Sequence, residues 1–293
     1  MGLYQLTEKL EAAEALDPLA ERLQEAIHKA VPTGPLKDAL SGTWLGHPVH
    51  PLLVALPIGT WIGALALDLT AGADRGRQAA ARSMVGVGVL TALPSALTGA
   101  SDWSDTTGAE RRVGLVHALG NYAAVALQAG SWLARRRGRR AKGIVLSLAA
   151  DAVVSVTGYL GGHMTYAQGV GVDTTAFGSG PEEWAAVADS AEIEESRPVA
   201  VDVDGVELLL VRQGGTLYAL ADRCTHRGGP LHEGELSAGC ITCPWHGSRF
   251  RLEDGSVEQG PAVQPQPVYE TRTVAGRVEV RRSEAKGLRS NSV

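Results

Sequence analysis

The sequence predicts a multidomain protein, in which an α-helical bundle of four transmembrane spans is followed by an all-β domain. Three observations predict this fold class. Between residues 43 and 163 the chain is dominated by long apolar stretches. From 182 to 282 short segments instead alternate between apolar and polar residues, which is the period of β-strands. A chain of 293 residues is also long enough for two domains of ordinary size.

Five regions follow one another along the chain. They are amphipathic N-terminal helices at 1–42, a four-helix transmembrane domain at 43–163, a Gly-rich linker at 164–181, the β domain at 182–282 and a disordered tail at 283–293. In the first region leucines recur at helical spacing, and Asp17-Pro18 with Glu21 is typical of a helix start. The polar faces of these helices are acidic, which argues against anionic lipid as their partner.

The second region contains four apolar stretches, at 49–69, 84–100, 113–133 and 143–160. A hydrocarbon core of about 30 Å requires roughly 20 helical residues, and only the second stretch is near the lower limit of about 17. Small residues are abundant in all four, as in membrane helices that pack closely. A buried soluble bundle is the alternative, because Ala-rich runs are only moderately hydrophobic. We favour four spans surrounded by membrane lipid.

The lysines and arginines of the short loops predict how the spans are oriented. Both the first and the third loop are basic, and the third carries Arg135, Arg136, Arg137, Arg139, Arg140 and Lys142. The middle loop has only Arg111 and Arg112, set against three acidic residues. Because basic loops remain in the cytoplasm, both termini and the β domain are expected outside.

Glycines without a helical pattern mark 164–181 as a hinge-like linker. In the β domain, strands are expected where apolar and polar residues alternate, at 199–203, 206–211, 217–220 and 268–280. Asp204-Gly205 and Gly214-Gly215 are typical of the turns between them. The tail after residue 282 has no pattern that predicts order.

Two short motifs in the β domain carry metal-binding residue types. Cys224-Thr-His226 and Cys243-Pro-Trp-His246 are separated by sixteen residues, and glycine and proline accompany both. Thiolates hold iron–sulfur clusters, and imidazoles can replace two of the four thiolates on one iron. A zinc site is the alternative, but a zinc finger pairs its two cysteines on one side and its two histidines on the other. Here each motif supplies one of each, so both histidines can face one iron.

These residues resemble the Rieske [2Fe-2S] domain over residues 182–282. The resemblance implies that Cys224 and Cys243 bind the inner iron of the cluster. It implies that His226 and His246 bind the outer iron at the tip of the domain. The protein is therefore expected to carry single electrons.

The resemblance also bears on the reduction potential. Quinol-oxidising members tie the two loops with a second cysteine pair, but Gly229 and Trp245 stand at those places here. Ser248 matches a position whose hydroxyl bonds a bridging sulfide and raises the potential, whereas Phe250 replaces a tyrosine that usually adds a second bond. Rieske potentials span about −150 to +300 mV. The features kept and lost favour a low-to-intermediate value, closer to a Rieske ferredoxin.

Histidines near the membrane spans form a second candidate site. Following the chain through the predicted spans places four histidines at one membrane face, near Asp102; they are His47, His50, His117 and His163. Ionisable residues in lipid are costly and are functional candidates. Three interpretations remain open: bis-histidine haem b, a quinone pocket in which a carboxylate takes protons, and interfacial histidines that only anchor the fold. Asp151, in mid-span, is expected to be a neutral acid bonded to a neighbouring helix rather than a proton carrier.

The helical region also resembles a family, over residues 43–172. The residues that carry the resemblance are His47-Pro-Val-His50, Leu97-Thr-Gly-Ala-Ser-Asp102-Trp103 and Gly158-Tyr-Leu-Gly-Gly-His163. They are similar to an uncharacterised bacterial four-helix membrane family whose members are sometimes fused to a Rieske domain. The resemblance implies a multi-pass protein of the bacterial cell membrane and no established reaction.

Composition and residue counts narrow the function further. Residues 182–282 hold 17 acidic and 10 basic residues, which excludes nucleic acid as a partner and favours a redox protein with a basic docking surface. An oxygenase iron needs two histidines and a carboxylate, and only His28 and His232 remain outside the two candidate sites. These two are far apart in the sequence, so we expect no oxygenase iron within this chain. We therefore expect a membrane-anchored one-electron carrier between haem b or quinone in the bundle and a partner redox protein. The alternative is a Rieske ferredoxin-type module for which the bundle is only an anchor or assembly domain.

Overall fold

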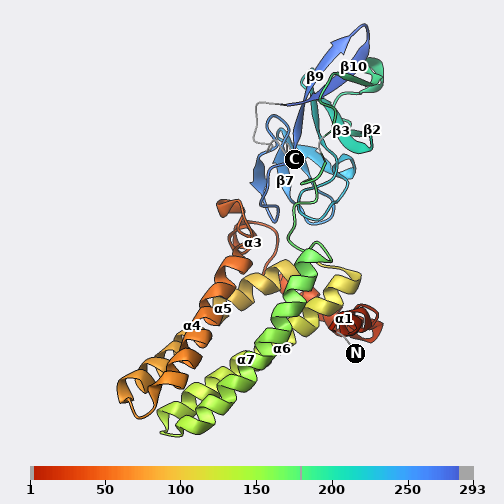
Figure 1. Cartoon of the computed structure of the whole chain (residues 1–293). Coiled ribbons are helices and arrows are strands. Elements are labelled where there is room, and N and C mark those ends of the chain that lie inside the picture. Colours follow the sequence, from red (N-terminus) through yellow and green to blue (C-terminus); the bar gives the residue numbers. More distant parts are fainter. Residues whose placement is uncertain (1–2, 179, 284–293) are drawn as a thin grey trace. The chain divides into compact units, whose positions relative to one another are not determined.

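The computed structural model describes residues 3–178 and 180–283, and these divide into two compact units (Figure 1). The first unit combines Met1–Pro32 with Pro48–Val170, and the second combines Thr33–His47 with Gly171–Val293. The segment Thr33–His47, which precedes the first apolar stretch, therefore belongs with the β domain. The predicted disordered tail lies outside the described residues, apart from Ser283.

The first unit is helical. Its helices are α1 (Leu3–Glu11), α2 (Asp17–Ala30), α4 (Val49–Ala71), α5 (Arg75–Trp103), α6 (Gly108–Arg136) and α7 (Arg140–Tyr166). Short turns join α4 to α5 and α6 to α7, so each pair packs side by side as a hairpin (Figure 1). Asp74 caps α5 by accepting hydrogen bonds from the backbone N–H groups of Gly76 and Arg77, a common way to satisfy the first turn of a helix.

Three of the long helices are apolar and long enough to cross a membrane: α4, α5 and α7. The short second apolar stretch, 84–100, lies within a longer helix, since α5 has 29 residues. The helix α6, which contains the third predicted span, is not among these three, so the predicted count of four spans is not confirmed among the described residues. Polar side chains recur on α6 at intervals of three, four or seven residues, which places them on one face of the helix; they are His117, Asn121, Gln128, Ser131 and Arg135.

The helices α1 and α2 pack against the long helices of the same unit through both apolar and charged contacts. Ala20 is buried in a cluster with Trp103 and Leu115. Acidic residues of α2 form ion pairs with α6. Asp17, for example, accepts two hydrogen bonds from the guanidinium of Arg112, at 2.9 and 2.6 Å. The acidic faces noted in the sequence therefore contact arginines of α6.

The second unit contains two antiparallel sheets. The larger has the order β1-β10-β9-β4-β3-β2 and the smaller the order β5-β6-β7-β8. Their bounds are β1 (Ala185–Asp189), β2 (Val199–Val203), β3 (Val206–Gln213), β4 (Thr216–Ala221), β5 (Glu235–Ser237), β6 (Cys240–Thr242), β7 (Arg249–Arg251), β8 (Val257–Gln259), β9 (Val268–Val274) and β10 (Arg277–Arg282). The unit also contains the short helix α3 (Pro35–Ser41) and the 3-10 turns η2 (Thr43–Leu45), η3 (Ser190–Glu192) and η4 (Leu231–Glu233).

The core of the second unit lies on both faces of the larger sheet. Along β3, Leu208 and Leu210 point to one cluster of buried residues, and Leu209 and Val211 point to another. This alternation is the period of two expected for a strand whose faces are both covered. The second cluster also contains Phe250 and both cysteines of the motifs, so the smaller sheet and the loops with the motifs pack on this face.

Candidate iron–sulfur site

Two loops of the second unit share one backbone geometry. The first follows β4 and contains Cys224 and His226, and the second follows β6 and contains Cys243 and His246. In each loop the glycine four residues after the cysteine donates its N–H to the cysteine carbonyl, Gly228 at 2.8 Å and Gly247 at 3.1 Å. Both glycines have positive φ, 77° and 74°, which favours glycine. The spacing of the motifs therefore fixes two similar turns.

The turns direct backbone N–H groups at the sulfur atoms. The amides of His226 and Arg227 hydrogen-bond to the Cys224 thiol, and those of Trp245 and His246 hydrogen-bond to the Cys243 thiol. Both thiols are buried, and they form a hydrogen bond with each other. That hydrogen bond lowers the pKa of Cys243 to about 7 and, together with burial, raises the pKa of Cys224 well above its usual range. Amide donors aimed at sulfur favour the thiolate form that binds metal.

The two histidines of the motifs face one another. The ring centroids of His226 and His246 are 5.1 Å apart, and the ring planes meet at 88°. Within residues 3–178 and 180–283, no three of the His, Cys, Asp and Glu side chains converge to hold a single metal ion. The hydrogen bond between the thiols and the contact between the rings arrange the four donors as a thiol pair and an imidazole pair. This donor set fits a two-iron cluster with two cysteines on one iron and two histidines on the other better than one tetrahedral zinc.

Gly229 and Trp245 occupy the space between the two loops. A Cβ atom on Gly229 would lie 2.8 Å from Cys243 Sγ and 3.0 Å from the nearest atom of the Trp245 ring. The Trp245 ring is 57% exposed and lies edge-on to His246, with ring centroids 6.5 Å apart. The absence of a side chain at residue 229 therefore lets the tryptophan cover the sulfur side of the site.

Ser248 and Phe250 follow the second motif and are both fully buried. The Ser248 hydroxyl oxygen accepts a hydrogen bond of 2.9 Å from the backbone N–H of Ala262, which leaves its proton to be donated elsewhere. Phe250 belongs to the core cluster and has no polar atom to offer. One hydroxyl and one purely apolar ring therefore accompany the motif.

Buried polar residues that the sequence analysis missed hold the first loop. The Gln266 side chain accepts the N–H of Thr225 at 3.1 Å and donates to the carbonyls of Ala221 and Arg223, both at 2.7 Å. Asp222 accepts from the backbone N–H of His232 and lies 2.7 Å from the ring of that histidine. No spacing in the sequence relates these residues, because Gln266 follows Thr225 by 41 residues.

Each membrane histidine of the helical unit lies close to a residue on another helix. His50 Nδ1 lies 2.9 Å from the Ser95 carbonyl, and His117 Nδ1 lies 2.8 Å from the Thr157 carbonyl. His163 Nε2 lies 2.7 Å from Glu11. His50 and His117 are close enough to interact electrostatically. Asp102 lies at the end of α5, and His47 belongs to the second unit.

This arrangement does not support haem b. An axial histidine ligand needs an imidazole nitrogen directed at iron, but both ring nitrogens of His117 already have protein partners. Its Nε2 lies 3.1 Å from the Asn121 amide, in addition to the contact of Nδ1 with Thr157. His163 uses its Nε2 in the pair with Glu11. His50, His117 and His163 therefore each connect their own helix to another one.

A buried ion pair at the other end of the helices was also missed. The guanidinium of Arg135 binds the carboxylate of Asp68 with two contacts, at 2.9 and 2.6 Å, and the two side chains are 3% and 4% exposed. Arg135 was expected only as part of a basic loop. Gln128 donates to Asp151 at 2.9 Å, which supplies the neighbouring-helix partner that the sequence did not identify for this acid.

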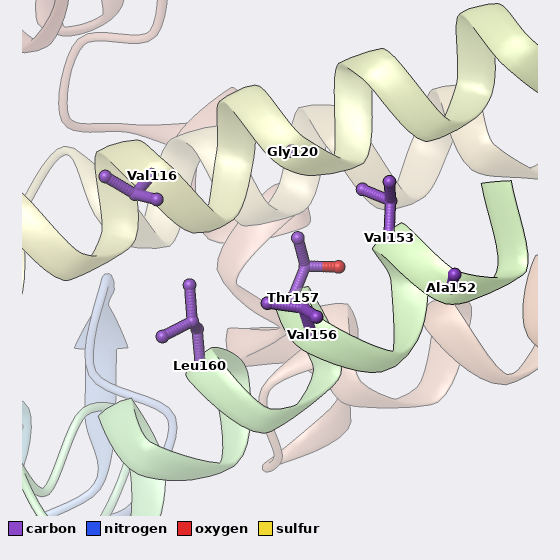
Figure 2. Close-up of a pocket in the computed structure, with 7 residues that line it drawn as sticks. All are labelled: Val116, Gly120, Ala152, Val153, Val156, Thr157 and Leu160. Atoms are coloured by element: carbon purple, nitrogen blue, oxygen red, sulfur yellow. The ribbon is translucent and has the colours of Figure 1, made fainter. Parts of the chain in front are cut away.

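An apolar groove of about 380 Å³ runs between α6 and α7 (Figure 2). Its lining residues are Val116, Gly120, Ala152, Val153, Val156, Thr157 and Leu160. Thr157, the polar residue among them, donates its hydroxyl to Asn121 at 2.9 Å. The backbone carbonyl of Thr157 lies 2.8 Å from His117 Nδ1, so the histidine lies beside an apolar groove.

The geometry defines a protein with an iron–sulfur domain joined to an apolar helical domain, and comparisons with known proteins agree. Residues 183–270 match the family described as "Rieske [2Fe-2S] domain", and residues 46–174 match "Predicted membrane protein (DUF2231)". The anthranilate 1,2-dioxygenase ferredoxin subunit of Burkholderia cepacia is 33% identical over 98 residues, which are 33% of this chain and 91% of that protein. The chain belongs to the Rieske [2Fe-2S] family and carries a DUF2231 domain in addition.

Two further matches each cover about a third of this chain. Apoptosis-inducing factor 3 of Homo sapiens is 33% identical over 99 residues, and the chain spans only 16% of the length of that protein. Among solved structures, the ferredoxin of carbazole 1,9a-dioxygenase from Nocardioides aromaticivorans IC177 is 30% identical. The match covers 34% of this chain and 98% of that ferredoxin, with a TM-score of 0.33.

Proposed function

We propose that Cys224, His226, Cys243 and His246 hold a [2Fe-2S] cluster and that the protein is a membrane-anchored one-electron carrier. The observation that carries this proposal is the pair of matching turns, which brings two amide-bonded thiols beside two facing imidazoles. Membership of the Rieske family supplies the cluster type. When bound, such a cluster accepts and donates single electrons.

The residues around the cluster favour a low-to-intermediate reduction potential. The four amide donors stabilise negative charge on the sulfur atoms. The Ser248 hydroxyl has a proton to donate toward the cluster, whereas Phe250 offers none and no disulfide joins the loops among the described residues. Ser248 is thus the one side-chain hydroxyl offered to the cluster by these two positions, and this combination is closer to a ferredoxin-type centre than to a quinol-oxidising one.

The proposal includes four membrane spans rather than three. With 29 residues, α6 is about 43 Å long, which exceeds a hydrocarbon core of about 30 Å. Its polar stripe faces α7, because Asn121, Gln128 and Ser131 all hydrogen-bond to α7 residues. Polar groups that are satisfied between helices are hidden from lipid. The apolar remainder of α6 is thus free to contact it.

The proposed orientation places the Rieske domain outside the cytoplasm of a bacterial cell. It follows from the basic turns between α4 and α5 and between α6 and α7, which are expected on the cytoplasmic side. A reporter enzyme fused to the carboxyl end tests it. A reporter that is active only outside the cytoplasm should be active in this fusion, and activity of a cytoplasmic reporter would contradict the orientation.

Two exchange partners are proposed for the electron. The first is a redox protein with a basic docking surface, since the Rieske domain is acidic and several relatives are ferredoxin components of dioxygenases. The second is a membrane quinone, which the apolar groove beside His117 favours over haem b (Figure 2). If no quinone reacts, the helical unit serves as an anchor or assembly domain only.

The quinone part is tested by filling the groove. Val156→Trp places an indole among the lining residues, and Val145→Trp is the matched control on the exposed face of the same helix outside the groove. The reduced full-length protein in detergent is mixed with a short-chain quinone, and re-oxidation is followed by absorbance. We expect Val156→Trp to slow re-oxidation and Val145→Trp to leave it unchanged. Equal rates in all three proteins would leave only the anchor role.

Chemical analysis of the purified full-length protein tests the cluster itself. We expect about two irons and two acid-labile sulfides per chain. Stoichiometric zinc, or iron without labile sulfide, would overturn the proposed function.

A further inference from the structure

Two chain segments connect the helical unit to the Rieske unit, and both belong to the Rieske unit. Thr33–His47 precedes α4, and the residues from Gly171 onward follow α7. The chain therefore passes between the units three times, after Pro32, after His47 and after Val170. The contacts of these two segments within the Rieske unit show what they do there.

The first segment binds the loop that follows β8. The Thr43 hydroxyl donates to the Ala262 carbonyl at 3.1 Å, and the Asp38 carboxylate accepts the Gly260 N–H at 2.9 Å. The Gln264 side chain donates to the carbonyl of Gly46. A Cβ on Gly260 would lie 2.3 Å from the Thr43 hydroxyl, so the close approach requires glycine. The loop from 260 to 264 is thus held at both ends and in the middle.

The same loop reaches the cluster site. The N–H of Ala262 donates to Ser248 Oγ at 2.9 Å, while its carbonyl accepts from Thr43. Ala262 and Ser248 are both fully buried. The Ser248 hydroxyl is expected to bond the cluster. Ala262 orients this hydroxyl through its N–H, and Thr43 fixes Ala262 through its carbonyl. Thr33 also lies beside Gly247, the residue before Ser248, since a Cβ on Gly247 would be 3.2 Å from the Thr33 methyl group.

The segment after α7 contacts the first loop of the cluster site. The Thr174 hydroxyl donates to the Cys224 carbonyl at 2.8 Å, and its N–H donates to the Thr225 carbonyl at 3.3 Å. The Cys224 carbonyl is the same one that accepts Gly228 N–H to close the turn. Each loop of the cluster site is therefore supported by one of the two segments that lead to the helical unit.

We propose that these connecting segments are positioning elements for the cluster, with Thr43 acting through Ala262 on Ser248 and Thr174 acting on the Cys224 turn. This inference rests on the proposed cluster function. Hydrogen bonds weaken steeply when distance and angle depart from their optimum, so a loop that shifts would misalign the Ser248 hydroxyl. The reduction potential then depends on contacts made by segments outside the residues that match the Rieske family, 183–270.

A double-mutant cycle on the full-length protein in detergent tests the route through Ser248. Thr43→Val, Ser248→Ala and the double variant are compared by voltammetry. Both single variants should lower the midpoint potential, Thr43→Val by less, and Thr43→Val should add nothing to Ser248→Ala. Thr271→Val is the matched control, because Thr271 donates to the Leu217 carbonyl at 2.9 Å in the sheet, and its potential should be unchanged.

The outcomes separate the inference from the proposed function. An intact cluster with the wild-type potential in Thr43→Val, or fully additive shifts in the double variant, would overturn the route through Ser248. Absence of labile sulfide in the wild type would overturn the proposed function instead. If Thr43→Val does not fold, Thr174→Val tests the second support, and the expected result is faster amide hydrogen exchange in residues 224–229 with a changed potential. Exchange and potential equal to wild type would overturn the inference.

Discussion

The two units of this chain place their polar groups in opposite ways. In the Rieske unit the candidate ligands come from two short loops, and each loop fixes its own geometry through a turn from cysteine to glycine. In the helical unit each residue of the polar stripe of α6 has a partner on another helix, as Arg135 does with Asp68, 67 residues away. Local backbone turns therefore set the geometry within each loop of the first site, whereas helix packing determines the second.

The largest effect expected from this comparison is loss of the cluster when one motif residue is removed. Cys243→Ser replaces a soft thiolate with a weak ligand, so the purified protein should lack labile sulfide and visible absorbance. Cys240→Ser is the matched control, because Cys240 is also buried in this unit but lies outside the two turns. Cluster content in Cys243→Ser equal to that of the control would contradict the ligand assignment.

A second large effect is expected in the helical unit. Asp68→Ala leaves the buried guanidinium of Arg135 without its carboxylate, which should lower the free energy of unfolding by roughly 3–5 kcal/mol. Thermal unfolding in detergent measures the change. Replacing both partners with leucine should recover much of the loss. The control Glu25→Ala removes an exposed pair with Lys29 and should leave stability unchanged. Equal effects of the two alanine variants would contradict a structural role for the buried pair.

A smaller effect is expected from Gly229→Ala. Its added Cβ would lie 2.8 Å from Cys243 Sγ, and such overpacking typically costs about 1–3 kcal/mol. We expect faster loss of iron to a chelator. Gly178→Ala is the control in the same unit, because its Cβ would make only an ordinary contact, at 3.7 Å from the Thr175 carbonyl. Identical iron-release rates would show that the space beside the sulfur is not limiting.

The smallest expected effect concerns pH and the N-terminal helices. The hydrogen bonds from Arg112 and Arg111 lower the pKa of Asp17 from 3.8 to about 2. Because the folded-state pKa is lowered, the stabilisation is present above pH 3.8 and is lost as the pH falls toward 2. Amide hydrogen exchange in α1 and α2, corrected for the intrinsic rate, should therefore increase over this window. Asp17→Asn should abolish the pH dependence, and flat exchange in the wild type would contradict it.

Much of the fold and of the cluster site could be predicted from the sequence. The expected strands correspond to β2, β3, β4 and the β9–β10 pair, because apolar and polar residues alternate along a strand that buries one face. The three-residue strands β5–β8 were not expected, since they are too short to show a period. The two Cys–His motifs could be recognised in the sequence because the cysteine and histidine of each are at most three positions apart, so a local turn is enough to bring them together.

The rest depends on contacts between distant residues. Nothing in the sequence assigns Thr33–His47 to the Rieske unit, because Thr43 and Ala262 are 219 residues apart. The sequence predicts that the histidines near the spans lie at the same membrane face. Their depth in the membrane does not specify which helix each imidazole ring contacts. The apolar count likewise missed the stripe of α6, since average hydropathy does not distinguish polar groups facing a neighbouring helix from those facing lipid.

Pulsed electron paramagnetic resonance of the chemically reduced, full-length protein tests the central claim most directly. The account predicts a rhombic signal with hyperfine couplings from two imidazole nitrogens, supplied by His226 and His246, and loss of that pattern in His246→Cys. A reduced cluster without nitrogen coupling, or no paramagnetic signal at all, would contradict it.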